Sequence, residues 1–230
     1  MRPLAVDIDG TLTRTHDDVG LDPRVFDALR AYHDHAPVVI ATGKAFPFPT
    51  ALCRYLNLPN RVIAENGGVT LCESAGITHN GDPEAARAVA DAYRAAGYDL
   101  GWGTPDLTNY WRETEVAVAL EQPFEPLQSL ATEHGLEVVD TGYAYHVKAP
   151  DVDKGTGLET IAADLGYEPS EFLAIGDSEN DAELFDIAGE SYAVANADDT
   201  ARAAADTVTE AGFADGFLEA LDEASVDAAP

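Results

Sequence analysis

The sequence predicts an α/β fold, in which a parallel sheet with helices on its faces is interrupted by a smaller inserted α+β segment. Short apolar runs alternate with helical patterns at both ends of the chain. A hairpin pattern and an alanine-rich helix replace that alternation in the middle. We therefore predict a core domain of residues 1–79 and 153–230, and an inserted cap domain of residues 80–152.

Each apolar run of the predicted core has the length of a buried strand and ends at polar or glycine residues. The expected strands are residues 4–8, 38–41, 62–65, 172–175 and 192–194. Helices are expected between them, at residues 23–32, 49–56, 155–165, 179–187 and 199–205, and residues 213–223 would close the fold. Asp22 followed by Pro23 is a typical helix start, because aspartate caps the first turn and proline fits the first position.

In the middle of the chain, the predicted strands and helices no longer alternate regularly. A hairpin is expected over residues 69–78, and a helix over 83–96. A strand at 115–120, a helix at 126–134 and hairpin strands at 136–140 and 143–148 complete the segment. The alternative to an insertion is that this segment simply extends the core sheet.

Acidic residues dominate the composition. The chain has 42 Asp and Glu against 13 Lys and Arg, for a formal charge of -29, and its three lysines are Lys44, Lys148 and Lys154. Nucleic acids and anionic membranes are poor partners for such a chain, because their binding needs a basic surface. Carboxylates spread along the whole sequence, with so few lysines, indicate adaptation to concentrated salt.

Other features of the composition also favour a soluble protein. Cys53 and Cys72 have no metal-binding spacing, so we expect buried, reduced thiols. We see no signal peptide and no apolar run as long as a membrane span, and we expect a cytoplasmic location. The sequence does not predict an oligomeric state.

Two carboxylates lie at the end of the first predicted strand. Asp7 and Asp9 are one residue apart, and side chains two positions apart on a strand point the same way. Open α/β sheets bind ligands at the carboxyl ends of their strands. Converging carboxylates repel one another unless a proton or a cation separates them, and Mg²⁺ accepts such oxygen ligands. Chance is the alternative, because so acidic a chain contains other Asp-x-Asp pairs.

Two further loops carry polar residues where a predicted strand ends. Thr42 and Gly43 could bind an anion through a hydroxyl and an amide, although Thr42 could merely cap the next helix. Asp177 could turn toward a cation beside Asp7, with Asp181 one helical turn further along. Helix capping and the helix dipole alone would also explain both aspartates.

Lys154 is conspicuous because lysine is so scarce. An ammonium group in an acidic site can neutralise Asp7 and hold a phosphate as a point charge. The alternative is an exposed lysine at a helix start, where the helix dipole disfavours a positive charge. That unfavourable position favours a functional role.

Four sequence blocks resemble, in order, the motifs of the haloacid dehalogenase superfamily. They are Asp7-Ile8-Asp9-Gly10-Thr11, Thr42-Gly43, Lys154-Gly155 and Gly176-Asp177-Ser178-Glu179-Asn180-Asp181. The Glu-Asn-Gly-Gly sequence at residues 65–68 and the predicted cap resemble the subfamily with a type-IIB cap. The short cap and the overall length are similar to those of archaeal phosphoglycolate phosphatases.

This resemblance implies a Rossmann-like three-layer core and a magnesium-dependent phosphomonoester hydrolase, with phosphoglycolate as the first candidate substrate. Asp7 would be the nucleophile that forms an aspartyl-phosphate, and Asp9 the general acid and base. Mg²⁺ would be held by Asp7, the Asp9 carbonyl and Asp177, with support from Asp181. Electrostatic stabilisation would come from Mg²⁺, Lys154 and the loop amides.

Four alternatives to this expectation are weighed against the sequence, and two of them are disfavoured. A phosphatase for a sugar phosphate or another small metabolite would use the same core. A phosphotransferase or mutase would return the phosphoryl group to a sugar and would release no inorganic phosphate. A non-catalytic phosphate-binding protein is disfavoured because no motif residue is missing, and a dehydrogenase because no Gly-x-Gly-x-x-Gly follows the first strand.

Arg112 is the one specificity candidate that the cap sequence offers. It lies in a segment poor in cations, and its guanidinium could form a bidentate pair with a substrate carboxylate. The alternative is a weak surface ion pair with Glu113 or Glu115.

We expect the charge of -29 to make stability depend on salt. The midpoint of thermal unfolding should rise between about 0.1 M and 2 M KCl, because salt shortens the reach of carboxylate repulsion from about 10 Å to about 3 Å or less. Thermal melts across a KCl series measure this dependence. A midpoint that does not change over this range would contradict adaptation to salt.

Overall fold

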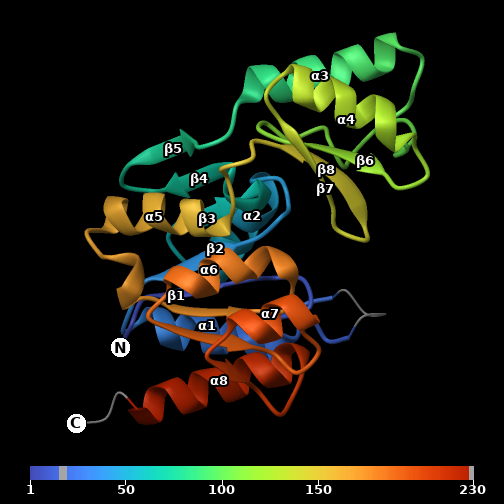
Figure 1. The fold of residues 1–230 in the computed structure, drawn as a ribbon. Helices are drawn as coiled ribbons and strands as arrows, with labels where there is room; N and C mark the ends of the chain where they lie inside the picture. The colour runs from blue at the N-terminus through green and yellow to red at the C-terminus, as the bar shows by residue number, and fades with distance from the viewer. Residues whose placement is uncertain (16–19, 228–230) are drawn as a thin grey trace.

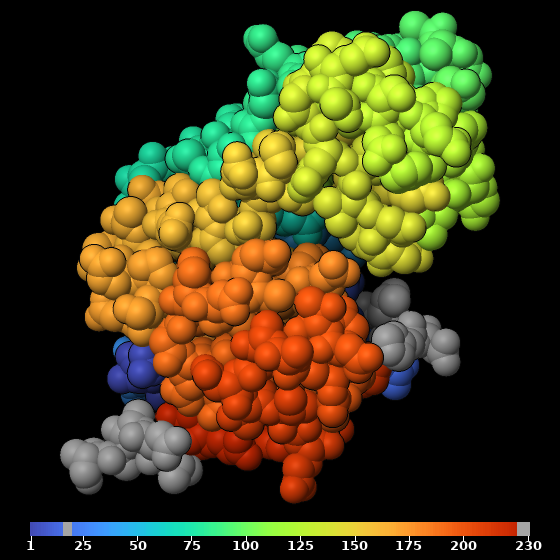
Figure 2. Space-filling model, in the orientation of Figure 1, coloured from blue at the N-terminus to red at the C-terminus, as the bar shows by residue number. Residues whose placement is uncertain are grey.

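The computed structural model describes residues 1–15 and 20–227, which form two units, each built on its own sheet (Figure 1). We call the unit with the eight-stranded sheet the core, and the unit with the three-stranded sheet the cap. The cap lies over one end of the core, and the two surfaces meet along a recess (Figure 2). The predicted α/β class, a mostly parallel sheet between helices with a small second sheet, is confirmed.

The core sheet has the strand order β11-β10-β9-β1-β2-β3-β4-β5. Its strands are β1 (Leu4–Val6), β2 (Val38–Ala41), β3 (Arg61–Ala64), β4 (Val69–Cys72), β5 (Gly76–His79), β9 (Leu173–Gly176), β10 (Glu190–Ala193) and β11 (Thr207–Val208). The strands from β11 to β3 pair in parallel, whereas β4 and β5 are antiparallel. The central strands are apolar because both of their faces are covered.

Helices cover the two faces of this sheet and give the core three layers. On one face lie α1 (Pro23–His33), α2 (Pro47–Leu56) and α8 (Phe213–Asp227), and on the other α5 (Lys154–Leu165), α6 (Ala182–Ile187) and α7 (Asp199–Ala204). The helical spacing of Val25 and Leu29 directs both side chains into the first of these layers, where neither is exposed to solvent. Short 3₁₀ turns are η1 (Glu65–Gly67), η2 (Pro169–Glu171) and η3 (Glu179–Asp181).

The cap is an antiparallel sheet of strand order β6-β8-β7 with two helices on it. Its elements are α3 (Pro83–Ala95), β6 (Val116–Ala119), α4 (Phe124–Glu133), β7 (Glu137–Asp140) and β8 (Ala144–Lys148). A separate apolar cluster, which includes Val89, Tyr93 and Leu127, holds this unit together. All five elements lie within residues 80–152, although the domain boundaries themselves stay a prediction.

Several element boundaries differ from those expected from the sequence. The first strand ends at Val6 rather than at residue 8, so Asp7 and Asp9 both lie in the loop that follows it. The loop turns at Gly10, whose φ of +83° suits glycine. The hairpin of β4 and β5 extends the core sheet, and the two-residue strand β11 was too short to carry a sequence signal.

The position of β1 decides where a ligand can bind. This strand pairs with β2 on one side and β9 on the other. The chain passes from β1 to β2 but from β9 to β10, so the connections from the neighbouring strands β1 and β9 run in opposite directions. Crevices at such topological switch points, at the carboxyl ends of strands, bind ligands in open α/β sheets. No helix in the described ranges, 1–15 and 20–227, is long and apolar enough to cross a membrane.

A close approach between α5 and β3 provides a test of the core packing. A Cβ on the buried Gly157 would lie 2.4 Å from Cγ2 of Ile63 and 3.1 Å from Cα of Gly67. We expect Gly157→Ala to lower the free energy of unfolding by about 1–3 kcal/mol, because overpacking outweighs the helix propensity of alanine.

Denaturant unfolding of the two variants Gly157→Ala and Ala163→Gly separates packing from propensity. Ala163 lies on the exposed side of the same helix, where a change to glycine should cost about 1 kcal/mol or less. A Gly157→Ala variant as stable as the unmodified protein, or more stable, would mean that the contact relaxes freely.

Candidate active site

The candidate residues of the sequence motifs meet at the carboxyl ends of the central strands. Asp7 follows β1, Thr42 follows β2 and Asp177 follows β9, while Lys154 begins α5. The Asp7 amide donates to the carbonyl of Ile175 in the neighbouring strand β9, at 3.0 Å. This hydrogen bond fixes the loop after β1 against the end of β9.

Lys154 lies at the centre of this group. Its Nζ is 2.8 Å from Oδ1 of Asp7 and 2.6 Å from Oδ1 of Asp181, and its side chain has no exposed surface. The exposed helix-start alternative for Lys154 is therefore wrong. Burial alone would lower the pKa of Lys154, but the Asp181 and Asp7 carboxylates outweigh it and raise that pKa above its usual range. The ammonium group stays charged.

Three buried carboxylates surround this single ammonium. One oxygen each from Asp7, Asp177 and Asp181 lie within 4.8 Å of one another. Burial, partly offset by Lys154 and reinforced by Asp181, raises the pKa of Asp7 to about 7. Burial and the nearby Asp7 and Asp181 charges raise the pKa of Asp177 to about 8. Carboxylates that are this reluctant to ionise are stabilised by a cation that accepts oxygen ligands.

The donor set fits a metal ion, and the three aspartates have different parts in it. Asp181 is already engaged, since its Oδ1 faces Lys154 and its Oδ2 accepts from the amides of Asp177 (3.0 Å) and Ser178 (3.2 Å). Asp7 and Asp177 are thus the carboxylates best placed to hold a cation. Glycine is needed at position 10, where a Cβ would lie 1.9 Å from an oxygen of Asp177.

Asp9 is in a different environment. Its side chain is 48% exposed, and Oδ2 lies 2.9 Å from Nζ of Lys44. Asp7 directly follows β1 and its amide is bound to Ile175 of β9, whereas Asp9 lies two residues further along the loop. Lys44 was not among the expected site residues, although its scarcity and its place beside Gly43 were a usable signal.

The loop after β2 positions Thr42 and Gly43. The Thr42 hydroxyl accepts a hydrogen bond from the Lys44 amide at 3.1 Å. The backbone carbonyl of Thr42 accepts one from the Asn66 amide at 3.3 Å. Helix α2 starts later, with Phe46 in the capping position, so the alternative role of Thr42 as the cap of that helix is not realised.

A cavity of about 660 Å³ lies over these loops, between core and cap. Its core lining includes both aspartates of the first motif, the Thr42 loop and part of the η3 loop. Its lining residues are Asp7, Asp9, Thr42, Gly43, Lys44, Ala45, Phe48, Asn66, Ser178 and Asn180 from the core, and Leu107, Thr108, Arg112, Thr141, Tyr143 and His146 from the cap. A polar floor under a partly apolar roof is typical of a small-molecule site.

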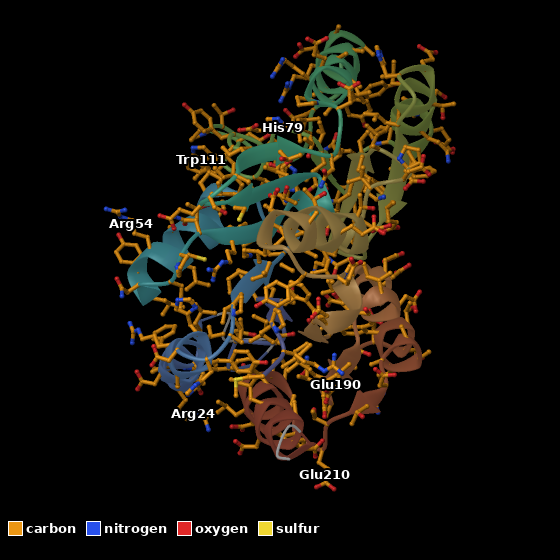
Figure 3. All side chains as sticks on the ribbon, turned by 90° about the vertical axis from the view of Figure 1, so that its left-hand side faces the viewer. Arg24, Arg54, His79, Trp111, Glu190 and Glu210 are labelled. Carbon is orange, nitrogen blue, oxygen red and sulfur yellow. The ribbon has the colours of Figure 1, made fainter. Side chains whose placement is uncertain are left out.

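A buried carboxylate fastens the cap to the core beside this cavity. The carboxylate of Glu65 accepts from the amides of Glu113 (2.9 Å) and Thr114 (2.8 Å) and from the Thr114 hydroxyl (2.9 Å). Burial raises the pKa of Glu65, and these hydrogen bonds partly offset the rise. The ring of Phe48 in the core also meets that of Trp111, from residues 80–152, edge to face with centroids 5.9 Å apart. Trp111 is labelled in Figure 3.

Asn66 joins three parts of the site. Its Nδ2 donates to Oε2 of Glu115 in the cap, and its Oδ1 accepts from Nδ2 of Asn180, both at 3.0 Å. Both Glu65 and Asn66 adopt positive φ angles, 50° and 51°, which are costly for residues with side chains and are held by these contacts. Residues 65–68 supported the resemblance but were not expected to form part of the site, and Glu115 was expected only in the alternative of a surface ion pair with Arg112.

A family model for haloacid dehalogenase-like hydrolases matches residues 4–100 and 119–221. The chain belongs to this family. The predicted membership of the haloacid dehalogenase superfamily, and with it the prediction of a hydrolase, is confirmed.

Relatives cover nearly the whole chain. A phosphoglycolate phosphatase of Natronomonas pharaonis is 66% identical over 223 residues, which cover 96% of this chain and 97% of the relative. One of Haloarcula marismortui is 58% identical over 220 residues, or 95% of each chain.

Solved structures share the fold of this hydrolase. A crystal structure from Thermoplasma acidophilum superposes with a TM-score of 0.81 at 23% identity and covers 98% of this chain and 99% of the other. A superfamily phosphatase from Bacteroides thetaiotaomicron gives a TM-score of 0.74 at 23% identity, with 98% and 96% covered. The structural matches include both the core and the cap.

We expect the affinity for Mg²⁺ to increase between pH 6 and pH 8. A cation at the aspartate cluster competes with protons on Asp7 and Asp177, whose pKa values are raised to about 7 and about 8. Calorimetric titration at fixed KCl measures the affinity and the proton release together. Asp177→Asn should abolish this binding, whereas Asp164→Asn, on the exposed side of α5, should leave it intact. An affinity that does not change with pH would contradict the assignment.

Proposed function

We propose that this hydrolase is a magnesium-dependent phosphomonoester phosphatase that forms an aspartyl-phosphate on Asp7. The observation that carries the proposal is the buried carboxylate of Asp7, held 2.8 Å from the Lys154 ammonium at the topological switch point and lining the cavity. A carboxylate fixed by an ammonium is oriented for attack, and that charge partly offsets the rise in the pKa of Asp7 that burial causes.

In the first step, an oxygen of Asp7 attacks phosphorus in line with the leaving group. The new O–P bond forms as the bond from phosphorus to the alkoxide oxygen breaks, and Asp9 gives its proton to that oxygen. Asp9 suits this role because it lines the cavity and is partly open to solvent. In the second step Asp9 takes a proton from water, the water oxygen attacks phosphorus, and Asp7 is released together with inorganic phosphate.

The phosphate oxygens would be bound by Lys154, the Thr42 hydroxyl and the Gly43 amide. Asp7, Asp177 and the Asp9 carbonyl would hold Mg²⁺, which would supply positive charge to offset the negative charge of the phosphoryl group. Asp181 supports the site by holding Lys154 and the amides of Asp177 and Ser178. These assignments give a physical task to each of the seven predicted site residues, Asp7, Asp9, Thr42, Gly43, Lys154, Asp177 and Asp181.

The substrate we propose is a small phosphorylated acid, phosphoglycolate first. Support comes from the relatives named phosphoglycolate phosphatases and from the cap over the cavity. We propose that residues 80–152 act as a cap domain that excludes water and selects the leaving group. The acidic composition and the haloarchaeal relatives support work in a salt-rich cytoplasm.

A release assay over phosphorylated metabolites tests the proposal directly. With Mg²⁺ and high KCl, phosphoglycolate should give inorganic phosphate faster than sugar phosphates do, and removal of Mg²⁺ by a chelator should stop the reaction. Faster hydrolysis of sugar phosphates would remove phosphoglycolate as the substrate. Transfer to a sugar acceptor without phosphate release would instead indicate a phosphotransferase.

We expect Asp7→Asn to abolish turnover in a folded protein, because an amide is not a competent nucleophile. Asp9→Asn should bind substrate but lose about 10²–10⁴-fold in kcat, the usual contribution of a general acid and base. Steady-state kinetics and quantitative mass spectrometry, which excludes deamidation back to aspartate, provide the measurement, with Asp164→Asn as the control. Full activity of an intact Asp7→Asn variant would contradict the mechanism.

A further inference from the structure

Arg112 is a buried cation in the wall of the cavity. Its side chain is 8% exposed, and it lines the same cavity as Asp7 and Asp9. The expected alternative was a weak surface ion pair with Glu113 or Glu115. The ion pair with Glu115 is present, but it does not lie on the surface, because both side chains are buried. Burying a guanidinium is costly, and burial lowers the pKa of Arg112. The chain has only 13 Lys and Arg, so a buried arginine in the cavity wall is conspicuous.

The contacts of Arg112 leave a donor unused. Nη1 is taken up by Oε1 of Glu115 in an ion pair, but the buried Nε has no hydrogen-bond partner within residues 1–15 and 20–227. A guanidinium has five N–H donors in a fixed fork, and a buried donor without a partner costs stability. The free donor therefore indicates a ligand that supplies acceptor oxygens.

Glu115, the counter-ion, is fixed from two other sides. Asn66 donates to its Oε2 at 3.0 Å, and Nδ1 of His146 lies 3.3 Å from its Oε1. Burial, Arg112 and Lys148 lower the pKa of His146 to about 3, so the imidazole is neutral. Glu115 is thus shared among three groups, and it satisfies Arg112 only on one side.

The same contacts place Arg112 close to the phosphate-binding loop. A Cβ on Gly43 would lie 2.8 Å from Oδ1 of Asn66, so the Asn66 side chain lies against this loop. Asn66 in turn touches Glu115, which touches Arg112. A molecule that reaches from the loop to Arg112 can therefore be short.

Charge in the cavity wall favours Arg112 over the other basic lining residue. Lys44 comes from the core and is paired with Asp9 at 2.9 Å. Among the cap residues that line the cavity, Arg112 is the one with a formal positive charge, since His146 is neutral. An anionic group of the substrate outside the phosphate would meet this guanidinium.

We propose that Arg112 binds the carboxylate of a short phosphorylated acid whose phosphate group lies at Asp7. This inference rests on the proposed phosphatase function and makes Arg112 the residue that selects acids over neutral esters. The planar guanidinium suits a carboxylate, because two parallel N–H···O bonds form in a partly desolvated site. A buried ion pair that only stabilises the cap is the competing role, and it would treat all substrates alike.

A matched pair of substrates separates these roles. Phosphoglycolate and ethyl phosphate have similar sizes and the same phosphate ester, but only the first carries a carboxylate. We expect Arg112→Ala to lower kcat/KM for phosphoglycolate by about 30- to 1,000-fold, with a much smaller loss on ethyl phosphate. Arg112→Lys should recover only part of the loss, because an ammonium lacks the fork. Arg94→Ala, an exposed arginine of the cap, is the control and should change neither value.

A second variant keeps the test valid if Arg112→Ala strands Glu115 and unfolds the cap. Arg112→Gln combined with Glu115→Gln removes both charges, and the same selective loss on phosphoglycolate is expected. Equal losses on both substrates, in whichever variant folds, would overturn the inference while leaving the phosphatase in place. Failure of the unmodified protein to release phosphate from either ester would overturn the proposed function itself.

Discussion

The ammonium of Lys154 between Asp7 and Asp181 is the interaction on which the site depends. Asp7, Asp177 and Asp181 gather their oxygens within 4.8 Å, and without this charge they would repel one another. The contacts at 2.8 and 2.6 Å also join the first loop of the chain to the start of α5 and to the η3 turn. The same ion pairs therefore hold together segments that are far apart in the sequence. Removal of Lys154 would disturb the packing as well as the chemistry.

The cap depends on a second set of buried polar contacts. Glu65 and Asn66 take unfavourable backbone conformations so that their side chains can bind residues 113–115. Asn66 also binds Asn180, two residues after Ser178 in the loop that positions Asp177. The cap is thus fastened to the loops that would hold the metal and the phosphate. A shift of the cap would therefore also move the loops of the candidate active site.

Much of the fold was predictable because strand and helix periodicity is strong in the core. The apolar runs at residues 38–41 and 172–175 became β2 and β9 with shifts of at most one residue. Asp7, Asp177, Asp181 and Lys154 were expected to meet, and they do. The hydrogen bonds of Glu65 with residues 113–114 and of Asn66 with Glu115 were not predictable, because they depend on how two units pack. The exposure of Asp9 likewise depends on the path of the loop after β1, which apolar residues alone do not determine.

The pairing of β1 has a consequence for the order in which the molecule can assemble. Leu4 pairs with Val38 on one side and Leu173 on the other, whereas the cap strands pair within residues 116–148. Local pairings close with less loss of chain entropy than distant ones. We expect cap amides to gain protection before the β1–β9 ladder during refolding, which pulsed hydrogen exchange would reveal. During synthesis, the loop that carries Asp7 and Asp9 could not dock on β9 until the last quarter of the chain had emerged from the ribosome.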